Sequence, residues 1–201
     1  MLIIGLAGGI GTGKSTVAGM LGDMGAVVID ADRLIRDAYG PGGELASLVA
    51  AEFGPEVLAA DGSADRAKIA AIVFGAPAAL ARINGIVHPW VRERWHAEVD
   101  AAAAQGFKVA VVEAALYVDK SVGFDQLWVT YVDRETQLQR TVGRGGLTRE
   151  QAEARMAAQI APAEHAAMPD VDVVVDTGGT LDEVRVRVRA LWDAQVAPLI
   201  A

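Results

Sequence analysis

The amino-acid sequence predicts an α/β fold in which helices flank a parallel sheet of five strands. Short runs rich in Val, Ile and Leu alternate with longer segments of helical pattern, an arrangement typical of parallel sheets. The 201 residues are 52% hydrophobic, which is enough to build a sizeable core. The first apolar run also leads directly into a glycine-rich turn and a helical segment. These observations favour one domain with insertions.

The expected strands are nearly continuous in apolar residues, as strands buried on both faces should be. A helical segment is expected over residues 14–24, and Gly25 is expected to cap its carboxyl end before the chain turns into the second strand. The five strands are expected at Leu2–Ala7, Ala26–Asp30, Lys108–Glu113, Leu127–Val132 and Val171–Asp176.

The turn after the first strand reads Gly-Gly-Ile-Gly-Thr-Gly-Lys-Ser over residues 8–15 and meets the pattern of a phosphate-binding loop. Its glycines allow backbone N–H groups to turn inward around a phosphate chain. Lys14 would reach the β- and γ-phosphates, and the Ser15 hydroxyl would ligate Mg²⁺. The following helix would direct its positive end toward the anion. The sequence therefore predicts a P-loop NTPase fold with a nucleoside triphosphate site.

Two insertions interrupt the alternation of strands and helices. Over residues 33–105 the strand signal disappears, and helical segments are expected at 43–53, 64–74 and 77–104. The last segment is expected to kink or break at Pro89, because proline lacks a backbone donor. The second insertion covers 135–167. The expected organisation is one domain over 1–201, with a core made of 1–32, 106–134 and 168–201.

Acidic residues follow two of the expected strands. Asp30 and Asp32 end the second strand, and Glu113 ends the third. Ligands of open parallel sheets bind beyond the carboxyl ends of the strands. A carboxylate there could hold Mg²⁺ or accept a proton from an attacking hydroxyl group, and the sequence leaves these roles open. Each acid could also cap a helix or lie in a solvated loop.

The second insertion is locally positive, with five arginines and three glutamates between Arg134 and Arg155. Arg140 and Arg144 are four residues apart, so on a helix both guanidinium groups would project from one face and clamp phosphate oxygens. Nearby glycines would permit hinge motion, and we expect this segment to act as a lid. Arg134, Arg149 and Arg155 are expected to form ordinary surface ion pairs.

Composition excludes several classes of function. A net charge of −8 argues against broad binding to nucleic acid. The chain has no cysteine, which excludes disulfides and thiolate metal sites and favours a cytoplasmic location. No basic leader precedes the first strand, and no membrane span is expected. The expected partners are small-molecule substrates, and the oligomeric state stays open.

Further motifs follow the phosphate loop in a specific order. They are Val28–Asp32, Phe53-Gly54 with Asp61-Gly62, His88-Pro89, Gln137–Arg140 followed by Arg144, Arg155 with Gln159, and the segment from Asp172 to Gly178. Together with residues 5–16 they resemble the dephospho-coenzyme A kinases, relatives of the nucleoside monophosphate kinases. The resemblance spans nearly the whole chain.

The resemblance implies transfer of the γ-phosphoryl group of ATP to the ribose 3′-hydroxyl of dephospho-coenzyme A, with Mg²⁺. Residues 33–105 would bind this acceptor, and 135–167 would be the lid. Asp32 would orient or deprotonate the hydroxyl, while Lys14 and Arg140 would neutralise the transferring phosphoryl group. His88 and Glu113 would contact the acceptor. The nucleotide would be held by Gly9, Gly11, Thr12, Gly13, Lys14, Ser15, Thr16 and Arg144.

Two positions depart from the family pattern. Many members have Asp-x-Pro-Leu-Leu-x-Glu after the third strand, whereas this chain has Glu113–Asp119 with the acids exchanged and the proline lost. The exchange alters the reach of both carboxylates toward the acceptor. Thr177 stands where Asn is common, and a hydroxyl cannot reproduce both the donor and the acceptor of an amide. The preference for ATP over GTP therefore stays open.

Two other functions fit the same motifs. Another small-molecule or nucleoside monophosphate kinase would keep the loop and the lid but have a different acceptor pocket. A nucleotide-dependent switch would need ordered switch loops and a water-activating residue, which no segment clearly supplies. Release of ADP that depends on the acceptor distinguishes a kinase from a switch.

Overall fold

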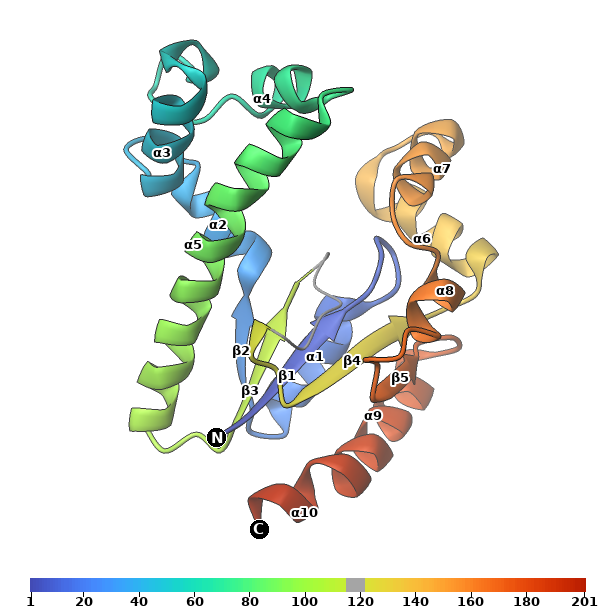
Figure 1. Cartoon of the computed structure of the whole chain (residues 1–201). Helices are drawn as coiled ribbons and strands as arrows, with labels where there is room; N and C mark the ends of the chain where they lie inside the picture. The colour runs from blue at the N-terminus through green and yellow to red at the C-terminus, as the bar shows by residue number, and fades with distance from the viewer. Residues whose placement is uncertain (115–121) are drawn as a thin grey trace. The chain divides into compact units, whose positions relative to one another are not determined.

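The computed structural model describes residues 1–114 and 122–201, except for the side chain of Arg144. Strands and helices alternate toward both ends of the chain, and residues 31–104 contain helices but no strand (Figure 1). The elements are β1 (Leu2–Ala7), α1 (Lys14–Asp23), β2 (Val27–Asp30), α2 (Ala31–Ala38), α3 (Glu44–Phe53), the 3₁₀ turn η1 (Pro55–Val57), α4 (Arg66–Val73), α5 (Pro77–Ala104), β3 (Val109–Glu113), β4 (Gln126–Tyr131), α6 (Arg134–Gly145), α7 (Arg149–Ala157), α8 (Pro162–Ala166), β5 (Val173–Asp176), α9 (Leu181–Gln195) and α10 (Ala197–Ile200).

The strands form one parallel sheet in the order β2-β3-β1-β4-β5. The predicted five-stranded α/β fold is therefore confirmed, with strand ends within two residues of those expected. In register, Glu113 of β3 lies beside Asp30 of β2 and beside Leu6 of β1. Because the strands are parallel, the chain leaves β1, β2 and β3 at the same edge of the sheet. That edge carries the glycine-rich loop and the acidic residues.

The sheet is held by a core that it shares with two helices. Ile4 and Leu6 of β1 are almost completely buried, and they pack with Val17 and Leu21 of α1 and with Trp192 of α9. Each large apolar side chain removed from water contributes roughly 1.5–3 kcal/mol to folding. Burial on this scale fixes α1 against the sheet and so fixes the position of the loop that precedes it.

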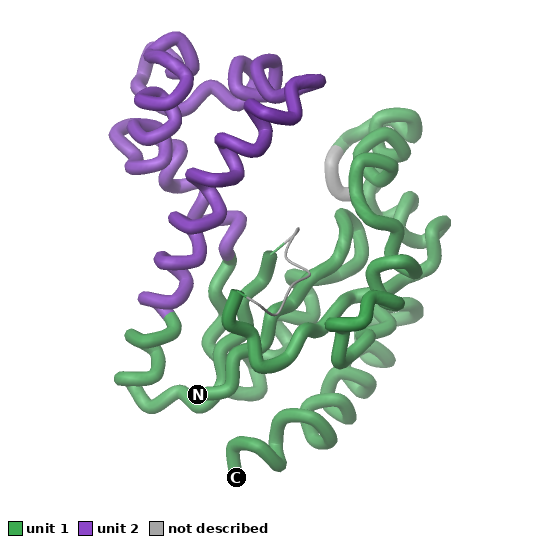
Figure 2. Tube along the Cα trace, in the orientation of Figure 1, with its two compact units in different colours: residues 1–30, 99–201 green, residues 31–98 purple. Residues whose placement is uncertain are grey.

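The chain divides into two compact units, which are described separately (Figure 2). Unit 1 comprises residues 1–30 and 99–201 and contains the whole sheet. Unit 2 comprises residues 31–98 and contains α2, α3, η1, α4 and most of α5. Its own core includes Val49, Val57, Ile69 and Ile83. The finer boundaries expected from the sequence, including the lid at 135–167, stay predictions.

Helix α2 begins directly after β2 and was not expected from the sequence. Asp32 therefore lies in the first turn of a helix, and the expectation that it ends the strand was wrong. The helix is strongly amphipathic, with Ala31 and Ala38 buried and charged side chains on its other face. A carboxylate in the first turn also interacts favourably with the positive end of the helix dipole.

Helix α5 runs without interruption from Pro77 to Ala104, so a break at Pro89 is contradicted, while a kink there stays a prediction. Val91 and Trp95, which follow this proline within the next two turns, are completely buried. Their burial outweighs the loss of about 3 kcal/mol that an interior proline causes. No helix in the described part of the chain, α5 included, combines the length and the apolar character needed to cross a membrane.

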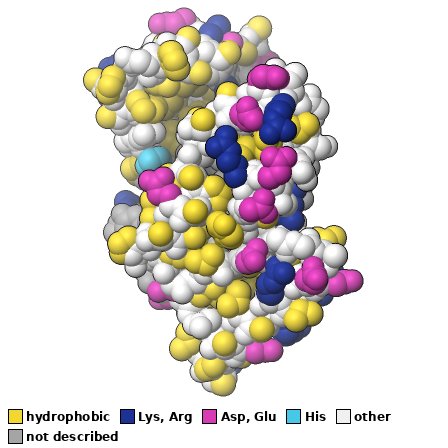
Figure 3. All heavy atoms as spheres, turned by 90° about the vertical axis from the view of Figure 1, so that its right-hand side faces the viewer, with side chains coloured by type: hydrophobic (Ala, Val, Ile, Leu, Met, Phe, Trp, Pro, Cys, Tyr) yellow, Lys and Arg dark blue, Asp and Glu magenta, His cyan; other side chains and the backbone are white. Residues whose placement is uncertain are grey.

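The segment from α6 to α9 has well-formed helix starts and a surface of mixed charge. Asp133 caps α6, and Thr148 and Thr180 form capping boxes at α7 and α9. Arg149 forms the expected surface ion pairs, with Glu135 at 3.6 Å and Glu153 at 3.2 Å. Figure 3, which shows this side of the molecule, has acidic and basic side chains interspersed on the surface. Exposed pairs of this kind contribute little to stability.

Candidate functional site

The glycine-rich loop between β1 and α1 adopts a backbone that requires glycine. Gly8 has φ 149° and Gly11 has φ 76°, both in the region that side chains disfavour. A Cβ atom at Gly8 would overlap the hydroxyl of Thr130, and one at Gly11 would crowd Thr141. The loop therefore fits closely against β4 and α6, and its shape depends on these two positions.

Side chains that are distant in the sequence of unit 1 hold the glycine-rich loop in place through hydrogen bonds. The hydroxyl of Thr12 donates to the carbonyl of Gly9 at 2.8 Å and lies 2.7 Å from the hydroxyl of Thr130 in β4. The amide of Gln137 donates to the carbonyl of Ile10, and the N–H of Ile10 donates to the side chain of Gln159, both at 2.8 Å. These buried and partly buried hydrogen bonds hold the loop in one shape before any ligand arrives.

Helix α1 begins at the end of the loop, and no side chain caps its first N–H groups. Gly13 is its N-cap and supplies no side-chain acceptor, and no acidic residue lies in the first turn. The N–H groups at the start of the helix and the positive end of its dipole therefore favour an anion at this point. Phosphate is the ligand that loops of this kind bind before a helix.

Lys14 and Ser15 occupy the first two positions of α1. The ammonium group of Lys14 donates to the carbonyl of Gly8 at 2.8 Å, so this side chain folds back across the loop. The hydroxyl of Ser15 donates to Oε1 of Glu113 at 2.7 Å. The Lys14 ammonium group and the oxygens of Ser15 and Glu113 thus lie where the loop leads into α1.

The Ser15 and Glu113 oxygens are of the kind that Mg²⁺ prefers. Among residues 1–114 and 122–201, no three His, Asp or Glu side chains are grouped so that they could hold a metal by themselves. Mg²⁺ usually takes only one or two protein ligands and completes its shell with water and substrate phosphates. The donor set at Ser15 and Glu113 fits such an ion.

Arg140 reaches the loop through Thr177, which follows β5. Its guanidinium group donates to the carbonyl of Thr177 at 2.8 Å and to the hydroxyl at 3.2 Å. The Thr177 hydroxyl in turn donates to the carbonyl of Thr12 at 2.8 Å and is buried. Thr177 therefore links α6 to the phosphate loop.

Some predicted site residues are placed only in part. Arg144 lies in α6 with Arg140, as expected, but its side chain lies outside the described structure. The loop after Glu113, whose altered acids were noted in the sequence, also lies largely outside the described residues. Asp32 and His88 belong to unit 2, where both side chains are exposed.

His165 of α8 is a buried residue that the sequence analysis missed. It is only 4% exposed, and its Nε2 atom has no hydrogen-bond partner. Burial and the nearby charge of Lys14 lower the pKa of this imidazole, burial having the larger effect. The side chain is therefore held neutral near the phosphate loop.

Two threonines of the site were also missed. Thr130 is completely buried within β4, and the Thr141 hydroxyl donates to the carbonyl of Gln137 at 2.8 Å. A signal for Thr130 was present, because it is the one aliphatic hydroxyl side chain in a strand run over residues 127–132 that is otherwise made of Val, Leu and aromatic residues. A polar group in such a run needs a buried partner, which Thr12 provides.

The order of strand, glycine-rich loop and helix, the lysine and serine at the helix start, and the parallel sheet define a P-loop nucleotide-binding fold of the kinase type. Comparison with known proteins gives the family. The model of the dephospho-CoA kinase family matches residues 2–183. The chain belongs to the dephospho-CoA kinase family.

Individual relatives agree with this assignment. The chain is 42% identical over 194 residues to a dephospho-CoA kinase of Geobacter sulfurreducens, covering 96% of this chain and 98% of that protein. It is similar to the crystal structure of TT1252 from Thermus thermophilus, with 28% identity, a TM-score of 0.79 and 98% coverage of both chains. A dephospho-CoA kinase structure from Campylobacter jejuni, 21% identical over 96% of both chains with a TM-score of 0.59, shares the fold.

Proposed function

We propose that this protein is an ATP-dependent kinase that phosphorylates the ribose 3′-hydroxyl of dephospho-coenzyme A, giving coenzyme A and ADP in the last step of coenzyme A synthesis. The proposal rests on a phosphate loop that is held in place by side-chain hydrogen bonds, in a chain that matches the dephospho-CoA kinase family over residues 2–183. The cytoplasmic location and the preference for ATP over GTP stay predictions.

In the proposed reaction the 3′-oxygen of the acceptor attacks the γ-phosphorus of ATP. The bond between this phosphorus and the β,γ-bridging oxygen breaks, and ADP leaves with the bonding electrons. Asp32 orients the hydroxyl and accepts its proton, which then passes to water. Phosphoryl transfer needs mainly alignment and charge stabilisation, and so one carboxylate and suitably placed cations form a sufficient set.

Charge stabilisation is assigned to the loop and to two basic side chains. The backbone N–H groups of Gly9, Gly11 and Gly13 would surround the β- and γ-phosphates together with Thr12 and Thr16. Lys14, which bonds the Gly8 carbonyl, would turn to the phosphates when ATP binds. Arg140 would approach the transferring group from α6, and Arg144 would contact the nucleotide.

Magnesium would be held by Ser15 and Glu113 along with phosphate oxygens. When bound, it supplies positive charge that neutralises the β- and γ-phosphates. Glu113 was expected to contact the acceptor, and its 2.7 Å bond with Ser15 favours this metal-binding role. His88 is retained as an acceptor contact on the family resemblance.

The test measures ADP release with and without dephospho-coenzyme A. We expect strong dependence on the acceptor and a product phosphorylated at the 3′-position. Hydrolysis of ATP at the same rate without the acceptor would indicate a switch protein, and activity only with another acceptor would indicate a different kinase. Either result would overturn the proposal.

Two variants test the assigned roles. Lys14→Ala should reduce kcat by about 10²-fold or more, because a cation on the β- and γ-phosphates is lost. Asp32→Asn should slow transfer while leaving the Kd for ATP nearly unchanged. Equal losses in ATP binding and in turnover for Asp32→Asn would indicate a structural role instead.

A further inference from the structure

Unit 2 contains a pocket of about 460 Å³ between α2 and α4. Its walls combine aliphatic side chains with one carboxylate and two guanidinium groups. The residues that matter here are Asp32, Ile35, Arg36, Tyr39, Arg66 and Ile69. The pocket thus contains the residue assigned to the acceptor hydroxyl, together with two cations that the sequence analysis did not single out.

The two cations of the pocket lack carboxylate partners. In the described part of the chain, neither Arg36 nor Arg66 forms an ion pair. Arg82 and Arg94 of α5, in contrast, pair with glutamates at 3.2 and 2.6 Å. In a protein with a net charge of −8, a pocket lined by two guanidinium groups and one carboxylate has an excess of positive charge and favours an anionic ligand.

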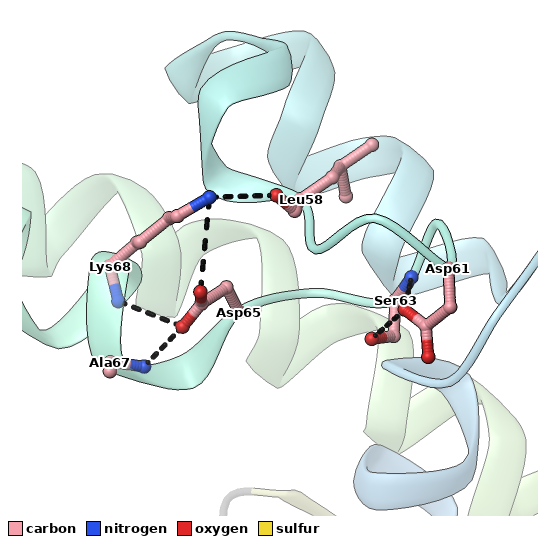
Figure 4. Close-up of polar contacts among 6 residues, drawn as sticks. All are labelled: Leu58, Asp61, Ser63, Asp65, Ala67 and Lys68. Carbon is pink, nitrogen blue, oxygen red and sulfur yellow. Dashed lines mark hydrogen bonds and ion pairs between the residues drawn. The ribbon is translucent and has the colours of Figure 1, made fainter.

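The start of α4 fixes the backbone at Arg66 (Figure 4). The side chain of Asp65 caps the helix by accepting from the N–H groups of Ala67 and Lys68, at 3.0 and 3.2 Å. The ammonium group of Lys68 donates to the carbonyl of Leu58 at 2.9 Å and so ties the helix to the preceding segment. Arg66 therefore projects from a backbone that is already ordered.

Tyr39 connects the two walls of the pocket. Its carbonyl accepts from the N–H of Ala64 at 2.8 Å, and the guanidinium carbon of Arg66 lies 5.8 Å from the centre of its ring. This cation–π contact holds the guanidinium group while leaving its N–H edge able to donate. Burial raises the pKa of the Tyr39 hydroxyl, so the ring stays neutral and does not repel an anion.

We infer that this pocket is the subsite for the diphosphate group of the acceptor, with Arg36 and Arg66 as its ligands. The inference rests on the proposed function. Asp32 and Arg36 are four residues apart on α2, so their Cβ atoms lie about 5–6 Å apart on one face of the helix. This spacing suits a ribose whose 3′-hydroxyl meets Asp32 while its 5′-phosphate meets Arg36. Ile35 and Ile69 provide an apolar wall for the chain that continues beyond the diphosphate.

The test compares Arg36→Gln, Arg66→Gln and the control Arg82→Gln. Arg82 is matched because its guanidinium group also stacks on an aromatic ring, that of Phe53 at 4.9 Å, but it does not line the pocket. Each pocket variant should raise the KM and the Kd for dephospho-coenzyme A about tenfold or more, the usual effect of losing a charge-assisted hydrogen bond. The KM for ATP should not change in any variant, and Arg82→Gln should behave like the wild type.

Two acceptor fragments separate the diphosphate from the base. Phosphopantetheine carries a phosphate but no adenine, and adenosine carries adenine but no phosphate. The wild type should be inhibited by phosphopantetheine in competition with dephospho-coenzyme A, and both pocket variants should weaken this inhibition about tenfold. The inference would be overturned if phosphopantetheine did not compete with dephospho-coenzyme A in the wild type. It would also be overturned if the pocket variants weakened inhibition by adenosine but not by phosphopantetheine.

Failure of the inference differs from failure of the proposed function. A wild type without acceptor-dependent ADP release would contradict the function itself. A wild type that is active on dephospho-coenzyme A, with unchanged KM and Kd in Arg36→Gln, would contradict only the subsite. Arg36→Gln is the more direct variant, because it leaves the contact between Arg66 and the Tyr39 ring intact.

Discussion

The hydroxyl of Ser15 donates a hydrogen bond to Oε1 of Glu113 at 2.7 Å and so joins the first turn of α1 to the end of β3. The two residues are 98 positions apart in the chain. The parallel register places the end of β3 directly beside β1, which leads into the loop. The sheet thereby brings a hydroxyl and a carboxylate together where the phosphates are proposed to bind.

The first prediction concerns Glu113. Glu113→Gln keeps the size of the side chain but removes its charge, so binding of Mg²⁺ should weaken and kcat should fall by about 10²-fold. The measurement is kcat as a function of Mg²⁺ concentration. The Mg²⁺ concentration that gives half of the maximal kcat should increase. Glu135→Gln, on the surface of α6, is the control. An unchanged Mg²⁺ dependence would assign Glu113 to the acceptor instead.

The second prediction concerns Thr177. Thr177→Val preserves shape but removes the hydroxyl that bonds the carbonyl of Thr12 and accepts from Arg140. Because this leaves a buried carbonyl without its donor, the free energy of unfolding should fall by about 1–3 kcal/mol. kcat should fall too, since Arg140 loses one anchor. Thr177→Ser, which keeps the hydroxyl, should retain most of the wild-type stability and most of the wild-type kcat. Urea unfolding measures the stability, and steady-state kinetics measures kcat.

The third prediction concerns the backbone of the phosphate loop. Gly8→Ala places a methyl group against the Thr130 hydroxyl at φ 149°, and should lower the free energy of unfolding by about 1–3 kcal/mol and abolish tight ATP binding. Gly19→Ala is the matched control. Gly19 lies within α1 with open space around it, so alanine there should raise stability by about 0.5–1 kcal/mol. Urea unfolding measures the free energy of unfolding of both variants. A Gly8→Ala variant as stable as the wild type would contradict the described loop geometry.

The fold was largely predictable because its signals are local. Buried parallel strands are continuous in Val, Ile and Leu, and the loop between β1 and α1 follows a fixed pattern. Helix α2 was missed because only half of its eight residues are apolar, and its amphipathic pattern is short. The break at Pro89 was wrongly expected because local propensity took no account of the burial of Val91 and Trp95.

The site was predictable in its residue types but not in its contacts. Lys14, Ser15 and Arg140 stand in recognisable motifs, yet their partners Gly8, Glu113 and Thr177 depend on how the chain folds. Such pairings arise from sheet register and helix packing, which one sequence does not specify.

His165 provides the last prediction, which concerns pH. Burial and the charge of Lys14 lower its pKa in the folded protein, while the unfolded chain titrates near the ordinary value of 6.5. Above this value the residue is neutral in both states and stability is unaffected. As pH falls below 6.5, the unfolded state binds the proton first, so the free energy of unfolding decreases until the lowered folded pKa is passed. Each unit of lowering corresponds to about 1.4 kcal/mol.

His165→Gln should remove this loss of stability between pH 6.5 and the lowered pKa of His165. His88→Gln, at an exposed position on α5, is the control substitution. The carboxylates whose pKa is lowered, such as Asp133 and Glu183, act in a separate range, because their stabilisation is lost only below their ordinary values of 3.8 and 4.5. Urea unfolding from pH 8 to pH 5 therefore isolates the imidazole, and identical profiles for the wild type and His165→Gln would mean that His165 is not held neutral by its surroundings.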